Sequence, residues 1–128
     1  MNLVLDSGGV TALAGQRARL AELRRRNLWP PQIPSVVLTE VLTGDHRRDH
    51  AANRLIAMCQ VRDVTELQAR DGARLRTATG RAGTISATDA IVAAFAAASV
   101  PAVVLTSDPD DLHALLDAQP GDVIVAHV

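Results

Sequence analysis

Residues 85–108 read Ile-Ser-Ala-Thr-Asp-Ala-Ile-Val-Ala-Ala-Phe-Ala-Ala-Ala-Ser-Val-Pro-Ala-Val-Val-Leu-Thr-Ser-Asp, and this stretch decides the fold. The segment 86–98 is predicted to be a helix, and beyond its first turn it has almost no polar residue. The segment 102–106 is a continuous apolar run, which is typical of a strand buried on both faces. A buried helix followed by such a strand predicts an α/β sandwich, with helices covering a parallel sheet.

On either side of this stretch the chain alternates between short apolar runs and helical patterns. Further strands are predicted over 2–5, just before Ser35, over 60–64 and over 123–126. Helices are predicted over 11–26, 35–42, 46–58, 65–78 and 109–116. Ser35 is the expected cap of the second of these helices, Leu67 and Leu75 are expected to face inward, and Pro120-Gly121 is expected to turn into the last strand.

The length of 128 residues suits one domain with one core, so residues 1–128 are predicted to form a single domain. No apolar stretch reaches the ~18 residues of a membrane span, and Asp6 stands where a signal peptide would be apolar. These features predict a cytoplasmic protein that does not enter a membrane. Cys59 is the only cysteine, which excludes an internal disulfide and a thiolate cluster for zinc.

The charges are unevenly distributed along the chain. All thirteen basic residues are arginines between Arg17 and Arg81, and residues 1–81 have a formal balance of +5. Residues 82–128 contain six aspartates and no basic residue, a balance of −6. Trp29 and Phe95 are the only aromatic residues, so base stacking on aromatic rings can contribute little to any RNA binding. Any RNA binding would therefore depend on charge, shape and backbone contacts.

Four acids fall where a parallel sheet would gather them. Asp6 follows the first strand, and Asp108 follows the strand 102–106 by two residues. Glu40 and Asp89 lie near the beginnings of predicted helices. Because sites in open parallel sheets form beyond the carboxyl ends of the strands, the four side chains are expected to converge on one edge.

Clustered carboxylates repel one another, and a hard divalent cation removes that penalty. Ligands that are all oxygen favour Mg²⁺ or Mn²⁺, which can polarise a phosphoryl oxygen and activate a bound water. Each acid also has a structural explanation. Asp6, Asp89 and Asp108 are suited to helix N-termini, and Glu40 can simply face solvent.

At this point the sequence resembles a known family. Met1-Asn-Leu-Val-Leu-Asp6-Ser7, Pro34-Ser-Val-Val-Leu-Thr-Glu40-Val, Ile85-Ser-Ala-Thr-Asp89-Ala-Ile-Val-Ala-Ala94 and Val104-Leu-Thr-Ser-Asp108-Pro-Asp-Asp-Leu112 resemble, in order, the four acidic motifs of PIN-domain ribonucleases. The likeness is narrower still to the VapC toxins of bacterial VapBC toxin–antitoxin pairs, and it covers essentially the whole chain. The pair Gly8-Gly9 is looser than the residues typical of the first motif.

The resemblance implies an α/β/α sandwich around a parallel sheet of about five strands. It implies hydrolysis of RNA by a water bound to Mg²⁺ or Mn²⁺, with Asp6 and Asp89 as the main ligands and Glu40 and Asp108 completing the catalytic and metal-binding set. It also implies a homodimer and a VapB-like antitoxin as partners. Candidate supporting residues are Ser7, Thr106, Ser107 and Asp111, and candidate RNA contacts are Arg47, Arg48, Arg54 and Arg81.

Other functions compete with this one. A non-catalytic PIN-like module that binds RNA or a partner would have the same fold, and a metal-dependent DNA nuclease would use similar chemistry. A phosphoaspartate domain is disfavoured, because the chain has no lysine and Gly8 stands where such phosphatases usually have a second aspartate. His46 and His50 have the spacing of metal ligands on one helix face, but no third ligand is evident nearby. His113 and His127 are isolated, so surface or packing roles are expected.

Overall fold

Five parallel strands form one sheet in the order β3-β2-β1-β4-β5. The structure is a computed structural model that describes residues 1–117 and 121–128, so the predicted turn at Pro120 lies outside the described residues. The strands are β1 (Asn2–Leu5), β2 (Gln32–Pro34), β3 (Gln60–Arg62), β4 (Ala102–Thr106) and β5 (Val123–His127). The predicted parallel sheet is confirmed.

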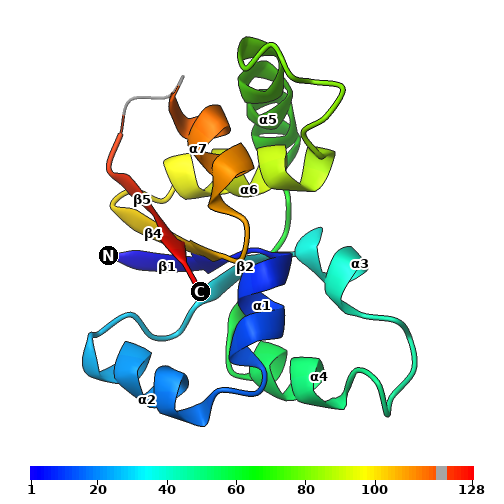
Figure 1. Cartoon of the computed structure of the whole chain (residues 1–128), viewed down its shortest axis with the longest axis vertical. Coiled ribbons are helices and arrows are strands. Elements are labelled where there is room, and N and C mark those ends of the chain that lie inside the picture. The colour runs from blue at the N-terminus through cyan, green and yellow to red at the C-terminus, as the bar shows by residue number, and fades with distance from the viewer. Residues whose placement is uncertain (118–120) are drawn as a thin grey trace.

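Helices cover both faces of this sheet. They are α1 (Ser7–Leu13), α2 (Arg17–Arg25), α3 (Val37–Val41), α4 (His50–Ala57), α5 (Glu66–Ala78), α6 (Ala87–Ala97) and α7 (Pro109–Asp117). Figure 1 shows α5, α6 and α7 on one side of the sheet and α1, α2 and α4 on the other. The predicted three-layer α/β/α sandwich is therefore confirmed.

The core lies where β1 and β4 meet α6. Leu3, Val4 and Leu5 of β1 are buried, and Val92 and Phe95 of α6 pack in the same cluster. A continuous apolar strand and an almost entirely apolar helix can bury their apolar side chains on all sides only in the middle of a layered structure. The stretch 85–108 thus forms the centre of the molecule.

Both ends of α5 are set by residues that lie next to them in the sequence. At the beginning of α5, the Thr65 hydroxyl accepts from the Gln68 N–H, and the Gln68 side chain accepts in return from the Thr65 N–H. At the other end Gly80 has a φ of +70°, which glycine adopts at little cost and which stops the helix. The connection to α6 therefore begins at a defined point.

Three predictions about helices were wrong in detail. The helix expected over 11–26 is two helices, because the chain turns at Ala14–Gln16 around Gly15, a weak helix former. Ser35 does not cap α3. Its N–H donates to the Arg62 carbonyl (2.8 Å) and extends the pairing of β2 with β3. Leu67 is 69% exposed, so only Leu75 faces inward from α5.

The connection between α3 and α4 is a turn where a helix was expected. The buried Asp49 carboxylate accepts from the Thr43 N–H (2.9 Å), the Thr43 hydroxyl (2.9 Å) and the Gly44 N–H (2.8 Å). These bonds, led by the Thr43 N–H, lower the pKa of Asp49. Because α4 begins only at His50, His46 and His50 do not share a helix face.

Among residues 1–117 and 121–128, no helix combines the length and the apolar character needed to span a membrane.

Candidate active site

The order of the strands places a topological switch beside β1. From β1 the chain next builds β2 on one side, and it later returns to build β4 on the other. Leu5 of β1 pairs in register with Leu105 of β4, so the two strands end level with each other. Asp6 directly follows β1, and Asp108 lies just beyond β4. Ligand sites in open parallel sheets form at such a point.

Asp6 is the most deeply buried carboxylate of this edge, with 5% of its surface exposed. Its Oδ1 accepts from the Gly9 N–H at 2.7 Å, which caps α1 and fixes the carboxylate. Burial raises the pKa of Asp6, and the negative charges of Glu40 and Asp108 raise it further. The nearby Thr106 hydroxyl and the Gly9 N–H act in the opposite direction. Ionised Asp6 is thus held in place at an electrostatic cost.

Asp89 lies in the first turn of α6, on the side of the sheet opposite α1. Its own N–H donates to the Ser86 hydroxyl at 3.1 Å, which caps the N-terminus of α6. Burial raises the pKa of Asp89, and the charges of Asp6, Asp111 and Glu40 add to that effect. Carboxylates from both helical layers therefore act on one another across the end of the sheet.

Glu40 and Asp108 are exposed at the same edge. Glu40 lines an open cavity of about 420 Å³ together with Ser7, Gly8, Thr11, Ala12 and Ser107. The backbone of Asp108 is held in place by a hydrogen bond, in which its N–H donates to the Thr106 hydroxyl at 3.1 Å. The structure thus brings the four predicted acids to one end of the sheet, beside the predicted supporting residues Ser7, Thr106 and Ser107.

The number of carboxylates that could bind one cation together limits how the predicted metal ion could be held. Within residues 1–117 and 121–128, no group of three or more His, Cys, Asp and Glu side chains is arranged to hold a metal ion. Mg²⁺ in proteins commonly keeps several waters and uses one or two carboxylates together with substrate phosphates. Asp6 and Asp89, which are partly desolvated and repelled by their neighbours, fit that description. A cation would remove the cost that raises both pKa values.

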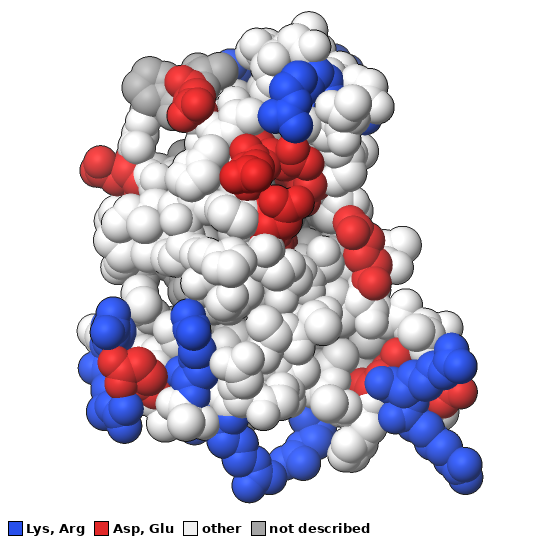
Figure 2. Space-filling view, in the orientation of Figure 1, with Lys and Arg blue, Asp and Glu red and all other residues white. Residues whose placement is uncertain are grey.

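The predicted RNA-contacting arginines lie in three different places. Arg81 donates to the Asp111 carboxylate at the margin of the acidic cluster. Arg47 and Arg48 lie on the turn that leads into α4, and Arg54 lies on α4 itself. Figure 2 shows acidic side chains gathered over α6 and α7, basic side chains immediately next to them, and larger basic regions over α2 and the connection between α3 and α4.

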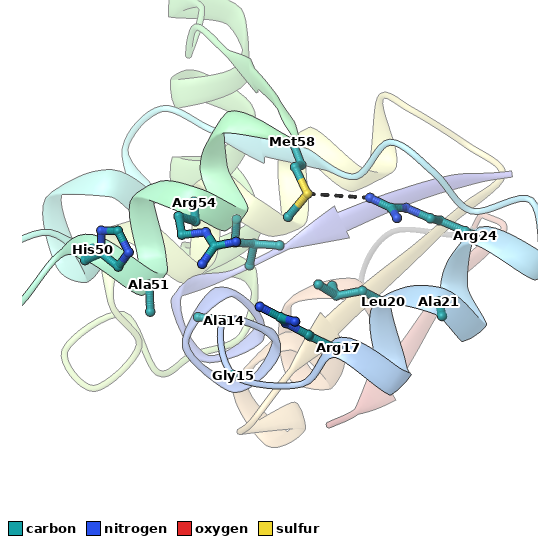
Figure 3. Close-up of a pocket in the computed structure, with 11 residues that line it drawn as sticks. Ala14, Gly15, Arg17, Leu20, Ala21, Arg24, His50, Ala51, Arg54 and Met58 are labelled. Atoms are coloured by element: carbon teal, nitrogen blue, oxygen red, sulfur yellow. Dashed lines mark hydrogen bonds between the residues drawn. The ribbon is translucent and has the colours of Figure 1, made fainter.

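Arg54 faces a groove between α1, α2 and α4 (Figure 3). This groove has a volume of about 400 Å³ and an apolar lining that includes Leu20 and Leu55. Arg17 and Arg24 border it from α2, and Arg24 donates to the Met58 sulfur at 3.5 Å. The groove is separate from the carboxylate edge, since the two sites share no lining residue.

His127 is a residue at this edge that the sequence did not indicate. It pairs in register with Thr106, and its Nε2 lies 3.0 Å from the Ser107 carbonyl oxygen. Ser107 lines the cavity beside Glu40, so the imidazole contacts the backbone of a residue that lines the site. Only the pairing of β5 with β4 brings His127 here, and no local pattern around it signals that position.

Comparison with solved structures shows which fold this is. No family model matches the sequence, and no curated protein matches it. A chain of the DNA-bound VapBC from Salmonella typhimurium superposes with a TM-score of 0.75 at 18% identity, covering 99% of this chain and 98% of that one. A chain of VapBC2 from Rickettsia felis, bound to a promoter DNA fragment, gives 0.71 at 17% identity, with coverage of 100% and 99%. VapBC-1 from nontypeable Haemophilus influenzae gives 0.69 at 17% identity, with coverage of 99% and 98%.

At these identities the likeness concerns the fold. The chain has the three-layer α/β/α fold of the matched chains, as its sequence led us to expect. The matched chains come from VapBC complexes, and the match extends over nearly the whole of each chain.

Proposed function

We propose that this protein is the toxin of a type II toxin–antitoxin pair and acts as a Mg²⁺- or Mn²⁺-dependent endoribonuclease. The observation that carries the proposal is the convergence of Asp6, Glu40, Asp89 and Asp108, from four separate segments, on the carboxyl end of the sheet. The PIN-domain fold shared with chains of VapBC complexes supports the same function.

The four acids divide into two pairs with different roles in the proposed mechanism. Asp6 and Asp89 would hold the cation, which supplies a polarised phosphoryl oxygen and an activated water when bound. The Gly9 N–H orients the Asp6 carboxylate at 2.7 Å, so its geometry is set before substrate arrives. Glu40 and Asp108 are exposed at the same edge and would hydrogen-bond water there, which aligns the nucleophile with the scissile phosphate.

The test is cleavage of a mixed RNA pool by purified protein with Mg²⁺, with Mn²⁺ and with EDTA. Asp6→Asn and Asp89→Asn are expected to lower the rate by at least about 100-fold, since each removes an anionic ligand of the cation that would stabilise the negatively charged transition state. Asp63→Asn is the matched control, because Asp63 is an exposed acid in the connection between β3 and α5. Equal rates for all three variants would refute the assignment of the site.

The same assay separates the competing functions. Cleavage of single-stranded DNA with RNA left intact would identify a DNA nuclease. RNA binding without cleavage under either metal would identify a non-catalytic module. A toxin should also arrest growth when it is expressed alone, and Asp6→Asn should relieve that arrest.

An antitoxin and a second copy of the chain are the proposed partners. The groove of Figure 3 offers an antitoxin segment an apolar lining bordered by guanidinium groups, which suits a helix that is apolar on one face and acidic on its flanks. Ala51→Trp would fill this groove, so it should abolish inhibition by the antitoxin and leave RNA cleavage unchanged. Light scattering on the purified protein tests the homodimer.

A further inference from the structure

Arg81 is the basic side chain that the fold brings against the acidic cluster. Its Nη2 lies 2.9 Å from Oδ1 of Asp111, although the two residues are 30 positions apart in the chain. Asp111 belongs to the cluster, since its charge contributes to the raised pKa of Asp89. Among the ion pairs found between described residues, the Arg81–Asp111 pair is the one that includes an acid of this edge.

The backbone of Arg81 is held independently of that ion pair. Its N–H donates to the Thr79 hydroxyl at 3.0 Å. Its carbonyl accepts from the Thr84 N–H at 2.9 Å, the Ile85 N–H at 3.0 Å and the Thr84 hydroxyl at 3.1 Å. The guanidinium therefore extends from a backbone held by hydrogen bonds, in the connection between α5 and α6, the helix that carries Asp89.

Fold stability does not explain this pair well. The Arg81 side chain is 49% exposed and that of Asp111 is 23% exposed, and ion pairs so accessible to water contribute little to stability. The alternative is a role in binding. A guanidinium has five N–H donors, and the contact with Asp111 occupies one of them. The remaining donors can form the two parallel bonds with which arginine binds phosphate.

We propose that Arg81 binds a non-bridging phosphate oxygen of the RNA backbone next to the scissile bond, and that Asp111 is the positioning residue that aims its guanidinium. This inference rests on the proposed nuclease function. The carboxylates repel a phosphodiester that approaches them. The positively charged guanidinium of Arg81, at the margin of the cluster, favours that approach. Base stacking is scarce in this protein, which leaves backbone contacts of this kind to hold a single strand.

The experiment compares two matched ion pairs. Arg81→Gln and Asp111→Asn disrupt the pair at the site. Arg70→Gln and Glu66→Gln disrupt an exposed pair of 2.8 Å on α5. RNA binding is measured by fluorescence anisotropy in EDTA, on a labelled oligonucleotide over a range of salt, and cleavage gives kcat and KM. Thermal unfolding of every variant shows whether it is folded.

Arg81→Gln is expected to weaken RNA binding about 10-fold and to reduce the slope of log affinity against log salt by about one. Arg81→Lys should restore the slope, but not the full kcat/KM, because an ammonium lacks the planar fork. Asp111→Asn should raise KM several-fold with a smaller change in kcat, and should add nothing to Arg81→Gln in the double variant. The α5 variants should match wild type within about 2-fold.

Three results would overturn the inference. Arg81→Gln could bind and cleave RNA as Arg70→Gln does, while wild-type cleavage confirms the nuclease. The effects of Arg81→Gln and Asp111→Asn could be fully additive, which would remove the positioning role of Asp111. Wild-type protein that neither binds nor cuts RNA would overturn this inference together with the proposed function.

Discussion

Gly8 lies so close to Ser107 that no side chain fits between them. A β-carbon built on Gly8 would overlap the Ser107 hydroxyl, and would stand 2.8 Å from Cβ and 2.9 Å from the backbone nitrogen of Ser107. The beginning of α1 therefore rests directly on the end of β4. This contact lies between Asp6 and Asp108, and it explains why residue 8 is glycine. Residue 9 is glycine for a similar reason, because a β-carbon there would overlap the Leu105 carbonyl oxygen.

Gly8→Ala is accordingly expected to lower the free energy of unfolding by about 1–3 kcal/mol, because something must move to admit the methyl group. RNA cleavage should fall as well, since α1 carries the N–H that orients Asp6. Thermal unfolding and the RNA assay measure the two effects. Gly15→Ala is the control, because nothing lies within 4 Å of a β-carbon there. If both variants lose equal stability, a general cost of replacing glycine rather than this contact is responsible.

Asp6→Asn should stabilise the metal-free protein at neutral pH. Burial first, and then the neighbouring carboxylates, raise the pKa of Asp6, so the folded state binds that proton more tightly than the unfolded chain. Stability therefore falls as pH rises from about 4, the ordinary carboxyl value, through the raised one. Asparagine retains the cap on α1 and has no charge to desolvate. The free energy of unfolding, measured between pH 3 and 8, should therefore change less with pH in the variant than in the wild type.

Mg²⁺ should stabilise the wild-type protein and have little effect on Asp6→Asn. A ligand that binds only the folded state at 100 times its Kd adds about 2.7 kcal/mol. Differential scanning fluorimetry with increasing Mg²⁺ measures the shift in Tm. An equal shift in the two proteins would place the cation somewhere other than at Asp6.

Leu75→Ala and Leu67→Ala should differ sharply although they lie on the same helix. Leu75 is 1% exposed, and removing its buried methyl groups is expected to cost about 2–5 kcal/mol. Leu67 is 69% exposed, so its truncation should change stability by less than about 0.5 kcal/mol. Chemical denaturation compares them. Similar losses would mean that α5 packs through a different face.

Cys59 should be unreactive in the folded protein. Burial raises the pKa of its thiol to about 11, so at pH 8 only about one thiol in a thousand is ionised. Labelling with a disulfide reagent should be slow in buffer and rapid in denaturant. Rapid labelling without denaturant would show that the region between α4 and β3 opens readily.

The sequence by itself determined the layers of this protein. The apolar run over 102–106 and the helical segment 86–98, which is almost free of polar residues, are local patterns, and with the alternation of short apolar runs and helical patterns they were enough to predict the sandwich. It also indicated four acids that belong at one edge, because each follows or begins an element whose direction the parallel sheet fixes. Leu67 and Ser35 were misplaced, because their surroundings depend on neighbouring elements rather than on nearby sequence.

Only the tertiary structure decided which side chains meet around those acids. Three contacts join residues that are far apart in the chain: Gly8 with Ser107, Arg81 with Asp111, and His127 with the Ser107 carbonyl oxygen. Such pairs depend on strand order, on register and on where a connection is anchored. A local sequence pattern has no information about a partner many residues away in the chain. These contacts at the edge of the site could therefore be identified only in the folded structure.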